Sequence, residues 1–344
     1  MKARSIVAPL MLAGVRAALA RTAGRRMPDV YTFNDRTVLI TGGSRGLGLI
    51  IARLLAEEGA KVAILARTQS QLDLAAEELR ARGADVLAIR GDVGDKAQAQ
   101  DAVQQVIDRW GRLDMLVNNA GIIQVGPIEH MSLEDFEQAM NVHMWGPFYT
   151  IMAALPHMRR QGESRIVNIS SIGGKIAVPH LAPYSVSKFA LVGLSDSLRA
   201  EFAKDNIHVT TVAPGLMQTG SPVNALFKGK REREYAWFAF LDTMPFTAID
   251  ANVAARQIIE ASRHKEPELT ITIQARLAVL ASTLFPGLFA KSMAIYARLL
   301  PGPAGKQGDA NKTGWESRSS LSEMPILQPL YENAEANNEQ LAVK

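Results

Sequence analysis

Short runs of β-branched and aliphatic residues alternate with helical patterns along the middle of the chain. The predicted strands cover residues 37–41, 61–66, 86–90, 115–118, 165–169, 208–213 and 269–273. Helical patterns fill the intervals, at 46–58, 69–82, 95–110, 132–160, 184–204 and 251–264. Strands that alternate with helices form mostly parallel sheets with helices on both faces, because each helix serves as a crossover. We therefore predict an α/β fold that is doubly wound around a seven-stranded, mostly parallel sheet.

An apolar and basic arm, residues 1–35, precedes this pattern. Val7, Met11, Val15 and Leu19 repeat every four residues, but Arg16 interrupts the apolar stretch. Three interpretations remain open: an amphipathic helix on a membrane or on the protein's own core, a cleaved secretory signal, or an unstructured extension. A membrane span is not indicated, because a span needs about 20 apolar residues.

Two further segments follow the catalytic domain that we predict over residues 36–275. Residues 276–300 are apolar and are divided by Pro286-Gly287, which predicts a helical extension of two parts. From residue 301 to 344 the composition shifts to Gly, Asn, Ser, Gln and Glu. We predict that this last segment is a loosely ordered tail, with residues 324–327 (MPIL) as a docking segment.

Composition and charge exclude several kinds of site. The chain has no cysteine, and its six histidines show no metal-binding spacing, so we predict no metal site. The net charge is +4, but the first 28 residues hold six Lys or Arg and no acid, which leaves 4 − 6 = −2 for the remainder. The basic excess therefore belongs to the arm, and we expect no nucleic-acid partner.

A glycine-rich turn joins the first predicted strand to the first helix. It reads Thr41-Gly42-Gly43-Ser44-Arg45-Gly46-Leu47-Gly48. Glycines at such a turn let the backbone approach a pyrophosphate, and the helix amino end adds free N–H groups. About twenty residues later, where an acid would hold the ribose 2′-hydroxyl of NAD, the chain has Arg67. A guanidinium can bind a 2′-phosphate instead, so we predict NADP (NADPH) as the cofactor, with Arg45 as a second positive charge.

A tyrosine and a lysine four residues apart form the candidate catalytic pair. Tyr184 and Lys188 lie on one helix face, and Ser171 follows a predicted strand thirteen residues earlier. An ammonium near a phenol favours its ionised form, so we expect Lys188 to lower the pKa of Tyr184 and to fit it for proton transfer.

Together these motifs resemble the short-chain dehydrogenases/reductases over about residues 36–275, which implies a Rossmann-type fold. The resemblance assigns Asp92 and Val93 to the adenine, and Asn118, Ala120 and Gly121 to the motif after the fourth strand. It assigns Pro214, Gly215 and Thr219 to the nicotinamide carboxamide. It implies Asn141, Ser171, Tyr184 and Lys188 as the catalytic set, with Tyr184 and Lys188 also contacting the cofactor.

The family mechanism implies hydride transfer between the nicotinamide and a carbonyl carbon. Tyr184 gives a proton to the oxygen, Ser171 holds that oxygen, and Asn141 holds a water that links Lys188 to solvent. Two alternatives remain: a sugar-nucleotide epimerase of the longer related branch, and a non-catalytic NADP-binding scaffold. Relatives also imply a homodimer or homotetramer.

The segment after Pro214-Gly215, at about 216–248, is the predicted pocket lid and is rich in large apolar residues. These are Leu226, Phe227, Tyr235, Trp237, Phe238, Phe240, Leu241, Met244 and Phe246. They predict an apolar, lipid-, acyl- or steroid-like carbonyl or alcohol as substrate, or else pack the lid onto the fold. Because 276–300 also resembles the C-terminal helices of membrane-associated hydroxysteroid dehydrogenases, we expect a cytoplasmic protein with peripheral membrane contact.

Overall fold

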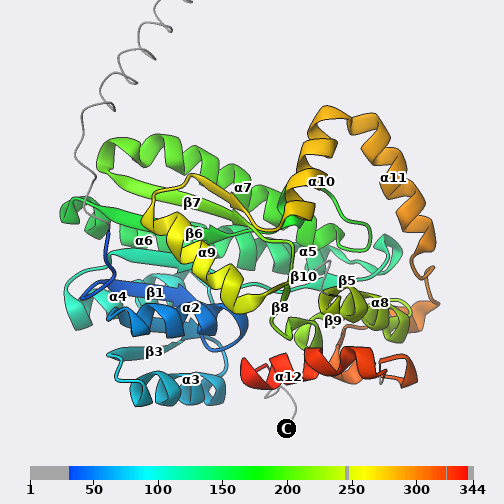
Figure 1. Cartoon of the computed structure of the whole chain (residues 1–344), viewed down its shortest axis with the longest axis horizontal. Helices are drawn as coiled ribbons and strands as arrows, with labels where there is room; N and C mark the ends of the chain where they lie inside the picture. Colours follow the sequence, from blue (N-terminus) through cyan, green and yellow to red (C-terminus); the bar gives the residue numbers. More distant parts are fainter. Residues whose placement is uncertain (1–30, 245–247, 323, 340–344) are drawn as a thin grey trace, which may run out of the picture. The chain divides into compact units, whose positions relative to one another are not determined.

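The computed structural model describes residues 31–244, 248–322 and 324–339 (Figure 1). The chain divides into two compact units, residues 1–31 and 32–344. The three interpretations of the N-terminal arm concern residues that lie outside the described part. The second unit contains the predicted sheet and everything that follows it.

A parallel sheet forms the centre of the second unit. Within the described residues it has seven strands in the order β11-β7-β6-β4-β1-β2-β3, and all six neighbouring pairs are parallel. The predicted sheet is thereby confirmed. The strands are β1 (Thr37–Thr41), β2 (Lys61–Ala66), β3 (Val86–Arg90), β4 (Met115–Asn118), β6 (Ser164–Ile169), β7 (Ile207–Ala213) and β11 (Glu268–Thr270).

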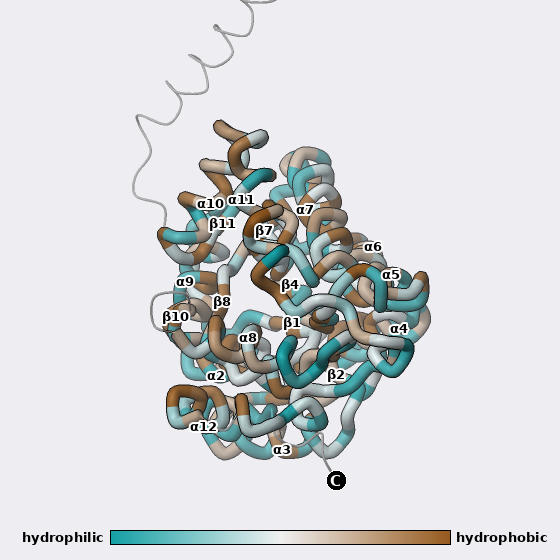
Figure 2. The backbone as a smooth tube through the Cα atoms, turned by 90° about the vertical axis from the view of Figure 1, so that its right-hand side faces the viewer, coloured by the Kyte–Doolittle hydropathy of each residue, from teal (hydrophilic) through white to brown (hydrophobic). Residues whose placement is uncertain are grey.

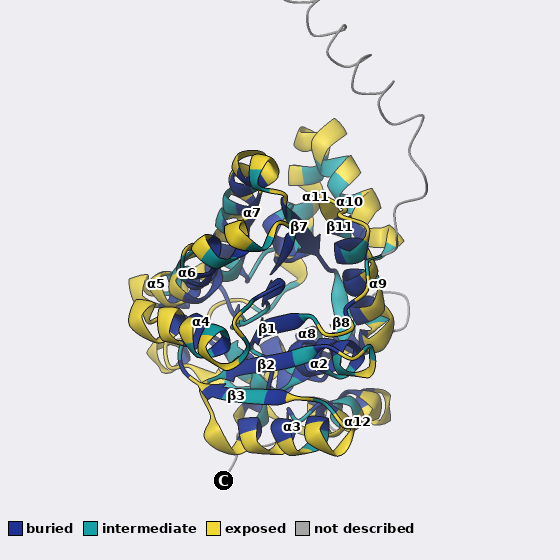
Figure 3. Cartoon of the chain, turned by 90° about the vertical axis from the view of Figure 1, so that its left-hand side faces the viewer, coloured by how far each residue is buried: buried dark blue, intermediate teal, exposed yellow. Residues whose placement is uncertain are grey.

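Helices cover both faces of this sheet, as the alternating pattern predicts (Figure 3). Helices α2 (Gly46–Glu57) and α9 (Ala251–Arg263) pack together on one face. On the other face α4 (Lys96–Trp110) packs against α6 (Gly146–Gln161), and α5 (Leu133–Met140) against α7 (Ala182–Phe202). Helix α3 (Gln69–Ala81) lies beside β2 and β3. A core of Val, Leu, Ile and Met side chains from the sheet and from α4, α6 and α7 is almost fully buried.

The sequence pattern at 132–160 predicts one long helix, but the structure has a break. Helix α5 ends at Met140, a π-helical turn covers Asn141–Trp145, and α6 begins at Gly146 with Pro147 in its first turn. A proline at the first turn of a helix is favourable because its missing N–H is not needed there. Apolar periodicity does not reveal a single π turn, because the hydrophobic positions on both sides still face the core.

Two small sheets and a helix form the region above the carboxyl ends of the strands. Strands β8 (Leu216–Gln218) and β10 (Ala248–Asp250) pair in parallel, and α8 (Arg231–Thr243) belongs to the predicted lid. Strand β9 (Leu226–Phe227) lies between β5 (Gln124–Val125) and β12 (Lys312–Thr313). Because β12 belongs to the C-terminal tail, the tail contributes a strand to the lid region.

The tail therefore differs from the expectation of loose order over its described residues. After β12 the chain forms short 3₁₀ turns and helix α12 (Gln328–Ala336). Leu327 and Leu330 are buried against Phe227, Tyr235 and Phe238 of the lid. The tail has few apolar side chains, so its composition alone predicts disorder. It is ordered because Leu327 and Leu330 are buried against apolar side chains of the lid. The docking role predicted for residues 324–327 fits Leu327, whereas Met324 and Ile326 stay exposed.

The apolar extension at 276–300 forms a hairpin of α10 (Ile273–Leu284) and α11 (Pro286–Leu299). The backbone of the hairpin is coloured largely hydrophobic in Figure 2 and largely exposed in Figure 3. Its exposed large apolar residues are Ile273, Leu277, Leu280, Leu284, Phe285, Leu288, Ile295 and Leu299. Among the described residues, no helix combines the length and hydropathy that crossing a bilayer requires.

Candidate active site

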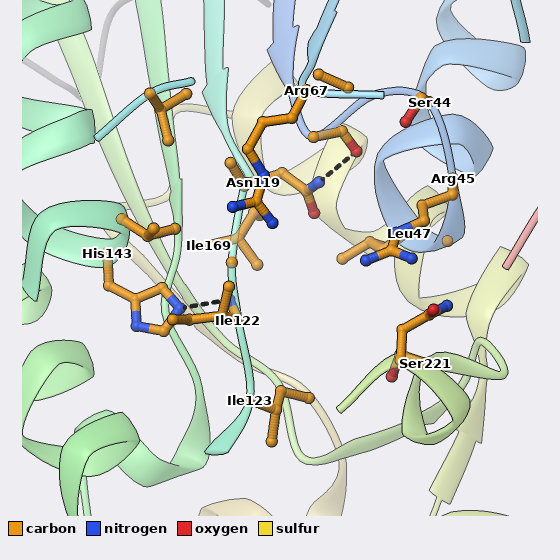
Figure 4. A pocket seen from close by; sticks show the side chains of 18 of the residues that line it. Ser44, Arg45, Leu47, Arg67, Asn119, Ile122, Ile123, His143, Ile169 and Ser221 are labelled. Carbon is orange, nitrogen blue, oxygen red and sulfur yellow. Dashed lines mark hydrogen bonds between the residues drawn. The ribbon is translucent and has the colours of Figure 1, made fainter. Parts of the chain in front are cut away.

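A cavity of about 470 Å³ opens at the carboxyl ends of the central strands (Figure 4). In doubly wound sheets this edge is where ligands bind. The glycine turn after β1 and the segments after β2, β3, β4 and β6 contribute to its wall. Residues of the lid and Glu339 of the tail complete it.

The glycine turn adopts a backbone that larger residues would distort. Gly42 and Gly46 have φ values of +65° and +53°, in the region that favours glycine. A Cβ on Gly48 would lie 2.2 Å from the Gly42 carbonyl oxygen. Arg45 is the N-cap of α2 but makes no side-chain cap, so its helix amino end can serve an anion.

Asparagine and threonine side chains tie the glycine turn to the segment after β4. The Thr41 hydroxyl accepts hydrogen bonds from the backbone N–H groups of Asn119 and Ala120, both at 3.0 Å. Asn118 is buried, donates to Asn168 on β6 and accepts from Thr150 on α6. Thr41 and Asn118 do not line the cavity, but their hydrogen bonds hold the segments that form its wall.

Two arginines line the cavity, and both side chains extend into it (Figure 4). Arg67 Nη1 lies 3.8 Å from Asp92 Oδ2, and Arg45 Nη1 lies 3.5 Å from Glu339 Oε2. Ser44 and Val93 line the same region. The guanidinium groups, the serine and a helix amino end without a side-chain cap are all groups that can hold an anion.

The candidate catalytic pair belongs to the same cavity. Tyr184 and Lys188 line the cavity, and Lys188 Nζ lies 5.6 Å from the centroid of the Tyr184 ring. Lys188 is buried and donates to the Ile169 carbonyl oxygen at 2.8 Å. A Cβ on Gly173 would come within 3.1 Å of the Tyr184 ring, so glycine leaves room for the ring there.

The pKa of Tyr184 shifts opposite to the expectation. Burial raises the pKa of Tyr184, and a hydrogen bond with the Ser171 side chain lowers it only in part. Burial also lowers the pKa of Lys188 to about 7. A lysine that is partly neutral at pH 7 does little to stabilise a phenolate, which explains why the predicted lowering is absent in the protein alone. Ser171 does stand beside Tyr184, as predicted.

Asn141 does not lie in the cavity. It begins the π-helical turn with its side chain exposed. His143, two residues later, lines the cavity instead and is 1% exposed. Residues two apart on a helix point about 200° apart, so a shift of two positions exchanges the inside for the outside. The prediction of Asn141 as a water-holding residue is therefore not supported by its position.

His143 connects three parts of the site. Its Nε2 accepts from the Ile122 N–H at 3.1 Å, and its Nδ1 lies 2.7 Å from Ser187 Oγ. Ser187 in turn donates to the Tyr184 carbonyl oxygen, and the imidazole meets the Tyr184 ring edge-on at 5.4 Å. These bonds place the proton on Nδ1. Burial, and then the Lys188 charge, hold the pKa of His143 well below its usual value, so it is neutral.

The remaining predicted residues fall into two groups. Thr219, Ala120 and Gly121 line the cavity together with Leu47. Pro214 and Gly215 lie behind it: the Pro214 carbonyl accepts from the Ile172 N–H, and Gly215 approaches Thr272. They position the lid strand β8, which starts at the next residue.

Most lid aromatics do not face the cavity. Phe227, Tyr235 and Phe238 are buried against each other and against the tail. Of the large apolar residues predicted for the lid, Leu226 lines the cavity, and Phe246 lies outside the described part. The aromatic content of the lid therefore serves packing more than substrate contact.

Comparisons with known proteins agree with this geometry. A family model described as short chain dehydrogenase matches residues 36–226. The chain is 41% identical over 187 residues to an uncharacterized oxidoreductase of Thermotoga maritima, a match that covers 54% of this chain and 74% of that protein. It is 38% identical over 194 residues to the ketoacyl reductase HetN of Nostoc sp., covering 56% of this chain and 68% of that protein.

A solved structure is similar over a larger share of the chain. The crystal structure of L-sorbose reductase from Gluconobacter frateurii, complexed with NADPH and L-sorbose, aligns with a TM-score of 0.64 and 26% identity. The alignment covers 70% of this chain and 97% of that chain. With the parallel sheet, the glycine turn and the matched family model, the chain belongs to the short-chain dehydrogenase/reductase family of oxidoreductases.

Proposed function

We propose that this oxidoreductase uses NADP(H) to interconvert a carbonyl and a secondary alcohol, with Tyr184 as the general acid and base. One observation carries the proposal: a single cavity is lined both by two arginines, Arg45 and Arg67, and by the pair Tyr184 and Lys188. Such a cavity suits a phosphorylated dinucleotide whose reactive ring lies beside a tyrosine.

The cofactor, when bound, supplies or accepts the hydride. In reduction the Tyr184 hydroxyl donates its proton to the substrate oxygen, and the Ser171 hydroxyl, beside Tyr184, holds that oxygen. Lys188, with a pKa of about 7, can return a proton to the tyrosine at neutral pH. The neutral His143 holds the tyrosine helix through Ser187 and keeps a second charge out of the site.

Tyr184→Phe tests the mechanism. The ring and its contacts with Gly173 and His143 remain, but the proton donor is lost. NADPH affinity is expected to stay within about twofold, while turnover falls by about 10² or more. Unaltered turnover would refute Tyr184 as the acid and base. Wild-type protein that binds NADPH yet converts no carbonyl or alcohol would point to the non-catalytic scaffold.

Arg67 and Arg45 support NADP over NAD. Arg67→Asp puts a carboxylate where the 2′-phosphate is expected, so we expect weaker NADPH binding and stronger NADH binding. Arg80→Asp, on helix α3 away from the cavity, is the matched control because it makes the same charge change. Equal ratios of the NADPH and NADH dissociation constants in both variants would contradict the assignment.

For the substrate we favour a carbonyl compound with an apolar face. The support is the apolar part of the cavity lining, which includes Ile122, Ile123, Met217 and Leu226. A panel of 3-ketoacyl thioesters, apolar ketones and keto sugars, followed by NADPH absorbance, tests this choice. Preference for keto sugars would contradict it.

We also propose peripheral contact of the α10–α11 hairpin with an anionic lipid surface. Its exposed apolar side chains are joined by Arg276, Lys291 and Arg298, and residues 271–300 contain no acid. Apolar and basic residues together are typical of interfacial helices. The triple change Leu284→Ser, Phe285→Ser and Leu288→Ser should abolish sedimentation of the protein with phosphatidylserine vesicles. A second variant that lacks residues 1–28 tests the arm separately. Sedimentation that survives the triple change excludes the hairpin as the anchor.

Exposed apolar residues on α6 and α7 support a homodimer or homotetramer. Trp145, just before α6, and Met152 on α6 are exposed, as are Val186 and Phe189 on α7. Phe189→Asp is expected to shift the light-scattering mass toward the monomer. A wild-type mass of one chain would reject the proposal.

A further inference from the structure

The last described residues of the tail lie across the glycine turn. We call residues 333–339 the strap. The Gly46 N–H donates to the Asn337 carbonyl oxygen at 2.9 Å, and Asn338 Nδ2 donates to the Ser44 carbonyl oxygen at 2.9 Å. Arg53 on α2 donates to the Asn337 side chain and to the Ala336 carbonyl oxygen. The strap is thus bonded to both the turn and the helix that follows it.

Glu339 reaches furthest into the cavity. Its residue is 3% exposed, and its carboxylate lies 3.5 Å from Arg45 Nη1. Asn224 Nδ2 donates to Glu339 Oε2 at 2.7 Å. The other carboxylate oxygen would stand 2.5 Å from a Cβ on Gly46, so the glycine leaves the space that Glu339 fills.

The strap uses the groups that a phosphate would use. Helix amino ends and guanidinium groups are the usual partners of a phosphate in a dinucleotide site. Here Asn337 accepts from the Gly46 N–H, and Glu339 pairs with Arg45. The place beside the glycine turn where a phosphate would bind is therefore already occupied by a carboxylate of the same chain.

The charge of Glu339 acts on a second buried carboxyl group, that of Asp242. Asp242 on α8 is 4% exposed, and among the described residues its Oδ2 has no hydrogen-bond partner. Burial, and then the Glu339 charge, raise the pKa of Asp242 well above its usual value. Burial also raises the pKa of Glu339, which Arg45 and Asn224 offset in part. Burial therefore opposes the charge of Glu339, and the Arg45 guanidinium offsets this cost only in part.

We propose that Glu339 is a specificity-determining residue of the cofactor site: its carboxylate competes with a cofactor phosphate for Arg45, the Asn337 carbonyl oxygen occupies the Gly46 N–H of α2, and the strap leaves when NADP(H) binds. The inference rests on the proposed cofactor. A phosphate monoester adds about 1.5 to 2 negative charges. Glu339 therefore weakens NADPH binding more than NADH binding.

Glu339→Gln removes the charge and keeps the size of the side chain. Glu335→Gln is the matched control, because Glu335 belongs to the same strap but is exposed, near the end of α12. Titration of nucleotide fluorescence gives the dissociation constants. We expect Glu339→Gln to lower the dissociation constant of NADPH about tenfold and that of NADH about threefold. The control should change each dissociation constant by less than about twofold. An NADPH constant that is unchanged or higher in Glu339→Gln overturns the inference.

Amide hydrogen exchange of the strap supplies a second readout. The N–H groups of Asn338 and Glu339 donate to the Glu335 and Ala334 carbonyl oxygens, so they are protected while the strap is seated. Saturating NADPH is expected to speed their exchange in the wild-type protein. Slower exchange would mean that the strap closes over the cofactor, which would contradict the proposal that cofactor binding displaces the strap.

The two proposals fail in different ways. If the wild-type protein and both variants bind neither dinucleotide, the proposed cofactor is wrong and the inference falls with it. If the wild-type protein binds NADPH and Glu339→Gln binds it equally well, the cofactor stands and only the role of Glu339 is refuted.

Discussion

Lys188 holds its ammonium 5.6 Å from the centre of the Tyr184 ring while donating to the carbonyl oxygen of Ile169. The two side chains are one helical turn apart, and both are buried in the protein alone. Burial opposes charge on each of them: it raises the pKa of the tyrosine and lowers that of the lysine. The site is therefore arranged around two groups that are held near neutrality.

Lys188→Met is expected to stabilise the fold at pH 7 while abolishing most turnover. The pKa of Lys188 is about 7 in the folded state and near 10.5 when unfolded, so the unfolded chain binds the extra proton between these values. Wild-type stability should therefore rise with pH from about 7 to about 10.5 through this group. The stability advantage of the variant should be largest at or below pH 7 and shrink by pH 10.

Thermal melting across that pH range measures the effect, with Lys204→Met on the surface as the control. A variant that melts lower than the wild type at pH 7 would show that Lys188 contributes favourable contacts greater than its burial cost.

Gly48→Ala should prevent cofactor binding without unfolding the sheet. Its Cβ would lie 2.2 Å from the Gly42 carbonyl oxygen, so the glycine turn has to move. We expect the NADPH dissociation constant to rise by about 10² or more, because the turn positions the helix amino end. Gly193→Ala is the control, since no atom lies within 4 Å of its added Cβ. Normal NADPH affinity in Gly48→Ala would place the phosphates elsewhere.

His143→Leu should destabilise the protein by about 2 to 4 kcal/mol. The change leaves the Ile122 N–H without its acceptor and removes the imidazole N–H that Ser187 Oγ accepts, and an unsatisfied buried group costs about 1 to 3 kcal/mol. Urea unfolding measures the loss.

His143→Asn tests the positioning role. A shorter polar side chain should retain the fold yet lower kcat about tenfold with little change in KM, because the Tyr184 helix loses its support. His264→Asn, at an exposed position, is the comparison. An unchanged kcat in His143→Asn would limit His143 to a structural role.

Leu330→Ala should cost about 2 to 4 kcal/mol, since Leu330 is 2% exposed and packs against the lid aromatics. The tail should then become sensitive to proteases near α12. Leu321→Ala, with its side chain 47% exposed, should cost less than about 0.5 kcal/mol. Equal stability of the two variants would show that the tail adds little to the fold.

The sheet could be predicted because each buried strand is a continuous apolar run between turn residues. Val38, Leu39 and Ile40 are fully buried, and the same holds along β2 and β4. Local composition was enough there. It was not enough for the tail, where Leu327 and Leu330 depend on partners about a hundred residues earlier in the chain.

Within the site, motif spacing placed most residues, and two features escaped it. A π-helical turn begins at Asn141, so the inward position belongs to His143, and no periodicity marks such a turn. The direction of the Tyr184 pKa shift also depends on burial, which appears only in three dimensions. The only signal in the sequence was that a histidine stands two residues after the expected asparagine.

The contact between Glu339 and Arg45 joins residues that are 294 positions apart, so Arg45 is synthesised long before its partner. Domains begin to fold from the amino-terminal side as the chain leaves the ribosome. The glycine turn, the sheet and the tyrosine helix are all made before the strap. A nascent chain consequently passes through a stage at which the place beside its glycine turn is uncovered, and a dinucleotide present in the surrounding solution can reach it before the strap does.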